Sequence, residues 1–281
     1  MEQEIKLLII NPGSTSTKIS IFENGVERYK KSLSHPASEV ARYARAADQA
    51  PFRQKAVEEF LAEIDYDLSG LTAIVARGGS LPPIHTGAYV VNDEMIDVLR
   101  NRPIGQHAST TAAIIALDMA KRLHIPVYIY DGNTADEMEP VSRISGCPLV
   151  PRLSMGHILN TKAVGRMYAQ RLGRKYGELN LIMVHLGGGI SIGLHKRGVI
   201  ADIMTDEEGT FSPERAGGLP SIGWARVCCS GEYTFEELSA MVRGKGGLTA
   251  YLGTNDVREV EAKVRAGDKK AALIYEAMIY Q

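Results

Sequence analysis

Two stretches of the sequence share one pattern, and this shared pattern is the strongest constraint on the fold. LLIINPGSTSTKISIFENG at residues 7–25 and LIMVHLGGGISIGLHKRG at residues 181–198 each contain an apolar run, a turn of small residues, a second alternating run and a turn with glycine. Apolar, β-branched runs that end at Asn-Gly or similar turns are typical of antiparallel hairpins. The sequence therefore predicts two similar hairpins, a weak internal repeat of architecture rather than of residue identity.

The rest of the chain alternates between patterns typical of strands and patterns typical of helices. A third strand is expected at residues 27–35, directly after the first hairpin, which would extend it into a meander. The alternation predicts an α/β protein, with domains at residues 1–150 and 151–281. The apolar side of the helix expected at residues 51–64 consists of Phe52, Ala56, Phe60 and Ile64. The other expected elements are strands at 71–79 and 126–130 and helices at 107–125, 160–173, 235–242, 256–267 and 268–281.

Composition narrows the class of protein. The 281 residues carry a formal net charge of −1 and are 44% hydrophobic, which is the balance of a globular protein without a basic face for nucleic acid. Three cysteines, Cys147, Cys228 and Cys229, are too few and too awkwardly spaced for a disulfide framework. The first residues lack the pattern of a signal peptide, and no apolar run is long enough to span a bilayer. We therefore expect a cytoplasmic protein that binds neither nucleic acid nor membranes.

The turns of both hairpins contain residues that suit phosphate groups. In the first hairpin, hydroxyl side chains at residues 14–17 follow Gly13 and precede Lys18. Small residues let a backbone approach a phosphate closely and a lysine adds positive charge, although the spacing of a Walker loop is absent. Three glycines at residues 187–189 permit the same close approach in the second hairpin. Taken alone, the first turn is equally consistent with a solvated Asn-Pro-Gly turn, and the second with a bulge or a tight turn.

Further motifs occur in a fixed order with the two hairpins. N-x-G-S-[ST]-S-x-K in the first hairpin and H-L-G-x-G-x-S in the second have ARGG, YDGNTADEM and GH-x-x-N between them. In these motifs the chain resembles the acetokinase family of ATP-dependent carboxylate kinases. INPGSTSTK, RGG, HLGGGISI and GGLTAYLGT resemble its butyrate kinase branch in particular. The resemblance covers essentially the whole chain and implies a duplicated actin-like (ribonuclease H-like) α/β fold of two domains, with ATP between them.

The resemblance also implies roles for individual residues. Arg77 would hold the acyl substrate or its phosphate, and Arg215 would be a second active-site arginine. Guanidinium groups can bridge a carboxylate and a phosphate because their planar donors bind such oxygens in pairs. Asp131 would be a catalytic or metal-associated aspartate, and His157 would lie near the transferred phosphoryl group. The phosphate loops would consist of Asn11, Ser14, Ser16 and Lys18 in the first hairpin and His185, Gly187, Gly188 and Gly189 in the second, with Asn11 and Asp131 also at Mg²⁺.

Each of the four single residues also has a purely structural interpretation. The alternative for Arg77 is a buried arginine paired with an acid, and the alternative for Asp131 is a cap on the turn that follows its strand. The alternatives for the other two are a residue that begins a helix, for His157, and an ion pair with Glu214 or Asp206, for Arg215.

The activity that the resemblance implies is reversible transfer of the γ-phosphoryl group of ATP to a short-chain carboxylate, with Mg²⁺, giving an acyl phosphate and ADP. Acetate kinases of the family carry bulky residues where this chain has RGG and Gly156, so we expect a larger acyl pocket and a preference for butyrate or a branched acid. The first alternative is an acetate or propionate kinase. The second is a non-catalytic actin-like nucleotide switch, which would need neither arginine. The family also implies a homo-oligomer.

The last residues form an amphipathic helical pattern that no glycine, proline or basic final turn ends. We therefore expect the chain to stop inside a helix and to be truncated at its C-terminus, which would leave the second domain incomplete. The family continues with a glycine-rich adenosine-binding segment, a glutamate near the metal and a helix that returns to the first domain, none of which lies in residues 1–281. A fragment of this kind would have weak affinity for ATP and little turnover.

Overall fold

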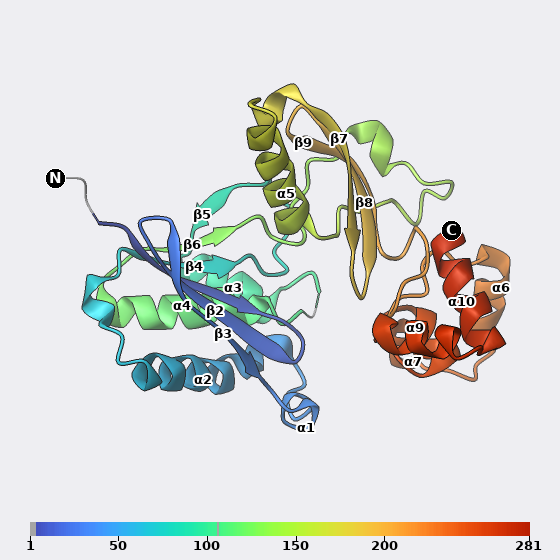
Figure 1. Ribbon diagram of the computed structural model, residues 1–281, viewed down its shortest axis with the longest axis horizontal. Coiled ribbons are helices and arrows are strands. Elements are labelled where there is room, and N and C mark those ends of the chain that lie inside the picture. The colour runs from blue at the N-terminus through green and yellow to red at the C-terminus, as the bar shows by residue number, and fades with distance from the viewer. Residues whose placement is uncertain (1–3, 106) are drawn as a thin grey trace. The chain divides into compact units, whose positions relative to one another are not determined.

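The computed structural model describes residues 4–105 and 107–281, which form two compact units, Met1–Asp136 and Glu137–Gln281 (Figure 1). Each unit contains a sheet and helices, so the predicted α/β class is confirmed. Residues 137–150 belong to the second unit by their contacts, whereas the predicted boundary lies at residue 150. The domain ranges stay a prediction. Among the described residues, no helix combines the length and the hydrophobicity that a membrane crossing needs.

The first unit is built on a sheet of six strands. These are β1 (Lys6–Pro12), β2 (Ser16–Glu23), β3 (Val26–Ser34), β4 (Ala73–Arg77), β5 (Ala88–Val90) and β6 (Val127–Tyr130), in the spatial order β3-β2-β1-β4-β6-β5. The predicted meander is confirmed, because β1 pairs antiparallel with β2 and β2 with β3. The other edge of β1 pairs in parallel with β4, and β4 pairs in parallel with β6. Three parallel strands therefore end at one edge of the sheet.

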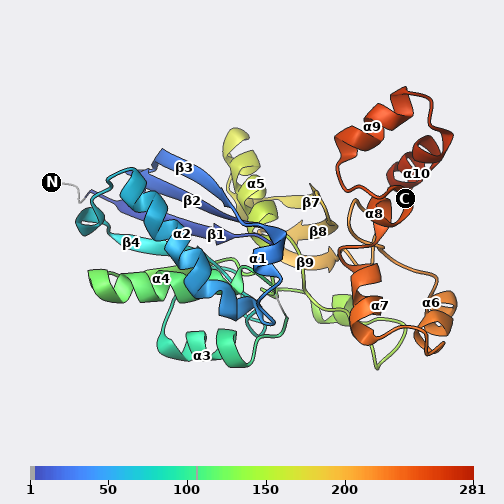
Figure 2. The same cartoon turned by 90° about the horizontal axis from the view of Figure 1, so that it is seen from below.

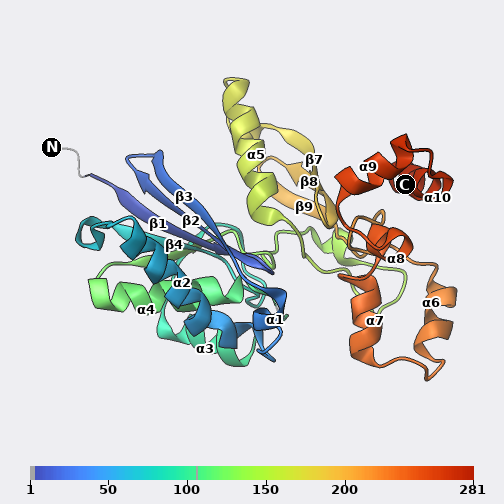
Figure 3. The same ribbon diagram turned by 60° about the horizontal axis from the view of Figure 1, so that its bottom comes forward.

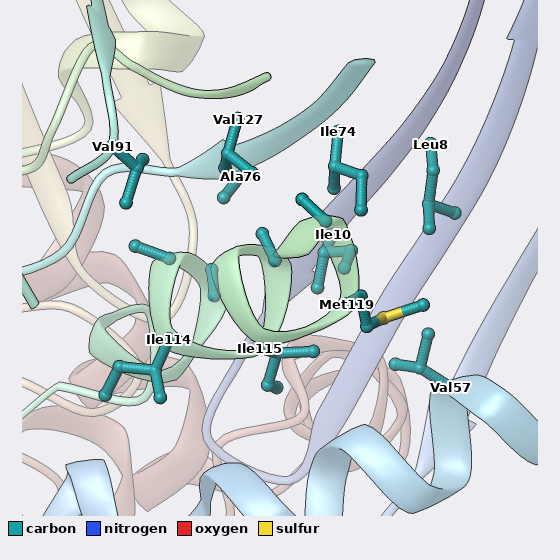
Figure 4. Packing of buried hydrophobic residues seen from close by; sticks show 14 of the residues in the cluster. Leu8, Ile10, Val57, Ile74, Ala76, Val91, Ile114, Ile115, Met119 and Val127 are labelled. Carbon is teal, nitrogen blue, oxygen red and sulfur yellow. The ribbon is translucent and has the colours of Figure 1, made fainter. Parts of the chain in front are cut away.

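Two helices pack on this sheet and on each other, α2 (Ala50–Glu63) and α4 (Thr110–Leu123), as Figure 2 shows. In the core, Leu8 and Ile10 of β1 and Ile74 of β4 meet α4, with Val57 of α2 beside them (Figure 4). These side chains are fully buried, and each contributes roughly 1.5–3 kcal/mol of hydrophobic stabilisation. The shorter elements of the unit are α1 (Ala37–Val40), α3 (Asp93–Asn101), η1 (Ala46–Gln49) and η2 (Leu68–Gly70).

The buried side of α2 differs from the predicted one. Phe60 is buried as expected, but Phe52, Ala56 and Ile64 are only partly buried. The helix is rotated so that Val57 and, with it, the charged side chain of Arg53 face the interior. The prediction of this face is therefore wrong in detail, and the correction places a buried cation inside the first unit.

The second unit contains a three-stranded antiparallel sheet, β7 (Asn180–Leu186), β8 (Ile190–Lys196) and β9 (Val199–Met204). The helix α5 (Ile158–Arg171) packs on β7 (Figure 3). The predicted hairpin is confirmed, and β9 extends it into a meander like that of β1, β2 and β3. The two turns that follow β2 and β8 have the same left-handed backbone, with φ of 50° and 81° at Asn24 and Gly25 and 52° and 84° at Arg197 and Gly198.

The irregularities of the two meanders also correspond. The register between β2 and β3 shifts after Ile21, and the register between β8 and β9 shifts after Leu194. Each shift comes three residues before the first left-handed residue of the turn. A β-bulge at the same distance from the same type of turn in both meanders is a specific backbone feature. The predicted repeat of architecture is therefore confirmed at the level of backbone geometry.

The rest of the second unit is helical. The three predicted tail helices are confirmed as α7 (Phe235–Val242), α9 (Val257–Arg265) and α10 (Lys269–Tyr280). Phe211, Leu248 and Val260 form the buried centre of this region. Cys147, Cys228 and Cys229 are free and exposed. The remaining elements are α6 (Ser221–Cys228), α8 (Gly247–Leu252), η3 (Pro140–Arg143) and η4 (Tyr176–Glu178).

Candidate active site

Three predicted site residues lie at the edge where the parallel strands of the first unit end. Ile10 is aligned with Ala76 and Arg77 with Tyr130. Asn11 is therefore aligned with Arg77 on the neighbouring strand, roughly 4.8 Å away, and Asp131 follows β6 directly. The sheet topology thus brings Asn11, Arg77 and Asp131 together from distant parts of the sequence.

The loops after β4 and β6 pass each other very closely. A Cβ atom added to Gly78 would lie 2.6 Å from the Cα atom of Gly132, which no real side chain tolerates. Asp131 has a left-handed backbone, with φ of 39°. Glycine at position 78 is thus a packing requirement, and the close contact holds the backbones that follow Arg77 and Asp131 against each other.

Arg77 is half-buried, and its guanidinium has no hydrogen-bond or ion-pair partner within residues 4–105 and 107–281. Burial lowers the pKa of this side chain from its ordinary value. An arginine stays charged even so, and a desolvated charge without a partner costs stability. The structural alternative of an arginine paired with an acid is therefore wrong, and the free cation suits an anionic ligand.

Asp131 is buried and braces a neighbouring segment. Its Oδ1 atom accepts a hydrogen bond from the N–H of Gly87 at 2.8 Å, and its own N–H donates to the carbonyl of Gly87 at 3.1 Å. The alternative of a purely structural aspartate thus holds in part, although the braced residue is not in its own turn. Asn11 and Asp131 supply amide and carboxylate oxygens, which are the hard donors that Mg²⁺ prefers in a sparse, hydrated site. The donor set therefore fits the predicted metal.

The turn between β1 and β2 is held in place by hydrogen bonds from the interior of the first unit. Ser14 and Lys18 are exposed and Ser16 is half-buried, so the three predicted side chains are accessible. The N–H of Gly13 donates to the carbonyl of Ser16 at 2.7 Å and closes the turn. From the interior, Arg53 donates to the carbonyls of residues 14 and 16. The turn is thus an ordered structure rather than a loosely solvated loop.

In the second unit, two predicted histidines lie against each other. The rings of His157 and His185 stack with their centroids 3.6 Å apart and their planes 7° from parallel. His157 shares a hydrogen bond of 3.0 Å with the hydroxyl of Ser191 through Nδ1. It also occupies the N-cap position of α5 without capping it by its side chain. The helix-start alternative is therefore correct as to position, and the ring itself contacts His185 and Ser191, which flank the glycine turn.

Arg215 lies beside the glycine turn but is paired with acids. Its Nε donates to Asp206 at 2.8 Å and its Nη1 donates to Glu214 at 3.3 Å. The ion-pair alternative for Arg215 is therefore confirmed, with both acids that the sequence suggested. The other oxygen of Asp206 accepts a hydrogen bond from Arg243 at 2.8 Å. Burial alone would raise the pKa of Asp206, but Arg243 and Arg215 together hold that pKa below its usual value.

The glycine turn packs directly on this cluster. A Cβ at Gly189 would lie 2.9 Å from Asp206, and one at Gly188 would lie 3.2 Å from the carboxylate of Glu214. Glycine therefore lets the turn approach the acid–arginine cluster. Through the same contacts, Arg215 is positioned next to residues 187–189.

Gly156 bears on the expectation of a larger acyl pocket. A Cβ at Gly156 would lie 2.6 Å from Cδ1 of Ile203, so the space beside this glycine is already filled. Gly156 thus packs against Ile203 of β9, and a larger residue here would require the Ile203 side chain to move. The larger acyl pocket stays a prediction.

Several structural residues of the site were not predicted. Arg53 lies 36 to 39 positions from the residues that it holds, and Arg243 lies 37 positions from Asp206, so no local motif signals them. The helical period of α2 is the one available signal, because a frame that includes Val57 also places Arg53 on the buried side.

Comparison with known proteins agrees with this geometry. Residues 156–281 match the model of the acetokinase family. Over 278 residues the chain is 48% identical to butyrate kinase 1 of Clostridium acetobutylicum and 46% identical to a probable butyrate kinase of Clostridium botulinum. Both alignments cover 98% of this chain and 78% of the relative.

Solved structures show the same fold at lower identity. The acetate kinase of Porphyromonas gingivalis superposes with a TM-score of 0.77 at 19% identity, and a propionate kinase of Francisella tularensis with 0.71 at 19%. Each comparison covers 98% of this chain and 77% of the other. The fold is therefore the duplicated actin-like α/β fold, and the class of protein is a carboxylate kinase.

More narrowly, the chain belongs to the acetokinase family, because its identity to curated members reaches 48% over most of both chains. Kinases of this family work with ATP or ADP and a divalent metal.

Proposed function

We propose that this kinase transfers the γ-phosphoryl group of ATP reversibly to butyrate or a branched short-chain acid, with Mg²⁺ as the metal. The names of the relatives support butyrate, since both curated proteins compared above are butyrate kinases or probable butyrate kinases. The observation that carries the proposal is Arg77, a half-buried guanidinium that no acid of the described chain neutralises. A carboxylate substrate is a fitting partner for this cation.

In the proposed mechanism, the residues at the edge of the first sheet bind and orient the acid. The planar guanidinium of Arg77 binds the carboxylate or the acyl phosphate through paired donors. The hydroxyl turn, with Ser14, Ser16 and Lys18, contacts phosphate oxygens. Asn11 and Asp131 hold the metal, which when bound supplies neutralising charge to the phosphate oxygens.

The residues of the second unit act on the phosphates in the same proposal. The glycine turn, residues 187–189, lets the backbone N–H groups approach the nucleotide phosphates closely. His157, stacked on His185, donates a hydrogen bond to the transferring group, and Arg215 binds its charge. Phosphoryl transfer depends mainly on such positioning and charge stabilisation. We also propose that the protein acts as a homo-oligomer, as the family resemblance suggests.

A panel of acids tests the substrate. ATP, Mg²⁺ and acetate, propionate, butyrate or isobutyrate are incubated with the protein, and hydroxylamine traps the acyl phosphate as a hydroxamate. Each methylene that the pocket buries is worth about 0.8 kcal/mol, so kcat/KM for butyrate should exceed that for acetate by about tenfold. Equal values, or a preference for acetate or propionate, would contradict the butyrate proposal. ATP binding without any hydroxamate would favour the nucleotide switch.

A further inference from the structure

Arg53 is the largest polar side chain that is completely buried in the first unit. It belongs to α2, and it donates four hydrogen bonds to groups in or next to the first turn and to Gln49. Nη2 donates to the carbonyl of Ser14 at 2.9 Å, and Nη1 donates to the carbonyl of Ser16 at 3.0 Å and to the hydroxyl of Thr17 at 3.1 Å. Nε donates to the amide oxygen of Gln49 at 3.0 Å. The guanidinium thus spans the turn from behind.

All of these acceptors are neutral. Across the part of the chain that the structure describes, no carboxylate forms an ion pair with Arg53. Burial lowers the pKa of this side chain, but a guanidinium retains its proton in proteins. A buried charge is ordinarily paired with an opposite charge because its desolvation is costly. The first unit therefore contains an uncompensated positive charge directly behind a turn that is rich in hydroxyl groups.

The surrounding network keeps this arrangement fixed. The hydroxyl oxygen of Thr17 accepts from Arg53, so its hydrogen is available to the ring nitrogen Nε2 of His35, 2.8 Å away. Thr17, His35 and Gln49 are all buried. Burial and then the charge of Arg53 lower the pKa of His35, which favours the neutral ring that can accept this hydrogen. The network therefore contains donors and neutral acceptors but no acid.

The carbonyl contacts also determine where the turn's N–H groups point. The carbonyl of Ser14 faces Arg53, and the carbonyl of Thr15 accepts from the N–H of His35 at 2.8 Å. In a trans peptide the N–H of the next residue points opposite to the carbonyl. The N–H of Thr15 therefore points away from Arg53. A backbone N–H that a turn presents in this way is a donor for an anion.

We propose that Arg53 is a positioning residue for phosphate binding: it holds the carbonyls of Ser14 and Ser16 inward, so that the N–H of Thr15 faces the ligand, and its charge is balanced when a phosphate occupies the turn. The inference rests on the proposed function, because it assumes that this turn contacts the phosphates of ATP. Arg53 itself is fully buried behind the turn and does not touch the ligand.

Two variants separate the geometric effect of Arg53 from its charge. Arg53→Lys keeps the charge but cannot span the carbonyls of residues 14 and 16 together, since a lysine lacks the fork of donors. Gln49→Glu keeps the shape and places a carboxylate beside Nε, which neutralises the guanidinium without breaking its contacts. Val57→Ala is the matched control, because Val57 is a fully buried residue of the same helix that has no part in the network.

The probe is inorganic tripolyphosphate, which carries the phosphate chain of ATP without adenosine, and its affinity is measured by calorimetry. Thermal unfolding of each variant is recorded in parallel. We expect Arg53→Lys to weaken binding at least tenfold. Gln49→Glu should weaken it three- to tenfold while leaving the melting temperature equal or higher. Val57→Ala should lower the melting temperature and leave the affinity within twofold of the unmodified protein.

A merely structural role for Arg53 predicts the opposite result for Gln49→Glu, namely a more stable protein with unchanged affinity. That result would overturn the inference, as would unchanged affinity in folded Arg53→Lys or no binding by the unmodified protein. If Arg53→Lys does not fold, Gln49→Glu alone decides. Failure of the kinase proposal would give a different result. Tripolyphosphate would still bind in a way that depends on Arg53, but ATP together with any of the acids would give no hydroxamate.

Discussion

The meanders of the two units have the same backbone plan and different chemistry around it. In each meander a turn with two left-handed residues joins the second strand to the third. The register between these two strands shifts at the same distance before that turn in both meanders. Asn11 and His185 occupy matching places, each the residue before the last of its first strand. The turns between the first and second strands differ, with hydroxyl groups in the first unit and bare glycines in the second. One backbone plan thus carries two turns of different chemistry.

What packs behind each turn accounts for the difference. The hydroxyl turn is held by a buried arginine, Arg53, whose partners among the described residues are all neutral. The glycine turn packs on Asp206, Arg215 and Glu214, where cations and acids are paired. The first turn therefore has an excess of positive charge, whereas the second has a balanced cluster. Removal of an arginine is expected to have different effects in the two units, depending on whether that arginine is paired with acids.

Burial of the matching strands differs as well. Leu8 and Ile10 of β1 are fully buried under α4, while Ile182 and Val184, at the corresponding positions of β7, are 73% and 51% exposed. β1 is paired on both edges, whereas among the described residues β7 pairs with β8 alone. An alternating apolar pattern thus indicates a strand but does not establish what covers it.

The largest expected effects come from two arginines of the site. Arg77 has no acid partner among the described residues, whereas Arg215 is paired with Asp206 and Glu214. Arg77→Ala should lower kcat for hydroxamate formation by about 100- to 1,000-fold, as loss of a transition-state donor does. Its melting temperature should stay equal or rise, because the lost charge had no partner. Arg215→Ala should lower both kcat and the melting temperature, since it leaves Asp206 and Glu214 without this cation. A loss of stability in Arg77→Ala equal to that in Arg215→Ala would remove the distinction.

The next effect concerns the balanced cluster of the second unit. Asp206→Asn should destabilise the protein by about 3 kcal/mol, because it leaves Arg215 and Arg243 facing an uncharged amide. The pKa of Asp206 is lowered in the folded state, so its contribution is present above the ordinary pKa of an aspartate and is lost as pH falls below about 4. Urea unfolding at pH 7 and pH 3.5 measures this. If the free energies of unfolding of Asp206→Asn and the unmodified protein differ by the same amount at both pH values, this pH dependence is contradicted.

A smaller effect concerns the pH dependence of stability that comes from His195. This histidine occupies the place in the second meander that Phe22 occupies in the first. Burial lowers the pKa of His195 to about 4. Its Nε2 atom has no hydrogen-bond partner among the described residues, and Lys162 adds repulsion. The unfolded chain therefore binds the proton more readily, so stability falls as pH decreases from about 6.5 to 4.

His195→Phe should remove this pH dependence, which amounts to about 2 to 3 kcal/mol. The measurement is the free energy of unfolding at pH 7 and at pH 4.5, and its slope is compared between the variant and the unmodified protein. The absolute stability of the variant does not matter, because a larger ring changes packing at every pH. An unchanged slope would show that His195 is not the titrating group.

The smallest effect tests the shared backbone itself. Gly25→Ala and Gly198→Ala place a side chain on left-handed residues with φ of 81° and 84° and should each cost about 1 kcal/mol. Gly198→Ala should cost more, because its Cβ would lie 3.3 Å from Gly177, whereas the space around Gly25 is open. Thermal unfolding gives the comparison. A substitution at Gly25 without cost would contradict the matching turn geometry.

The elements that the sequence predicts well are those whose signal is local. Both hairpins, α4 and the tail helices follow from period and turn residues alone. The helix α3 was missed although Asn92 caps its start through a side-chain bond to Met95, a signal present in the sequence. The short strand β5 has no such signal, because pairing with β6 creates it.

For the site, the residues of motifs could be predicted but the partners behind them could not. Arg77 is the last residue of one apolar strand and Asp131 follows another, and parallel pairing brings the ends of these two strands together. The roles of Arg53 and Arg243 depend on tertiary packing across more than thirty positions. The filled space beside Gly156 likewise comes from Ile203 on another strand, which no local pattern reveals.

The central claim, which rests on the proposed function, is that the turn in each unit binds phosphate groups of ATP. Amide hydrogen exchange of the protein with and without saturating ATP and Mg²⁺, resolved to peptides that contain residues 13–17 and 187–189, tests it most directly. The account predicts slower exchange in both peptides when ATP is bound, and loss of the effect at residues 13–17 in Arg53→Lys. Protection of neither turn, or protection confined to other segments, would contradict the account.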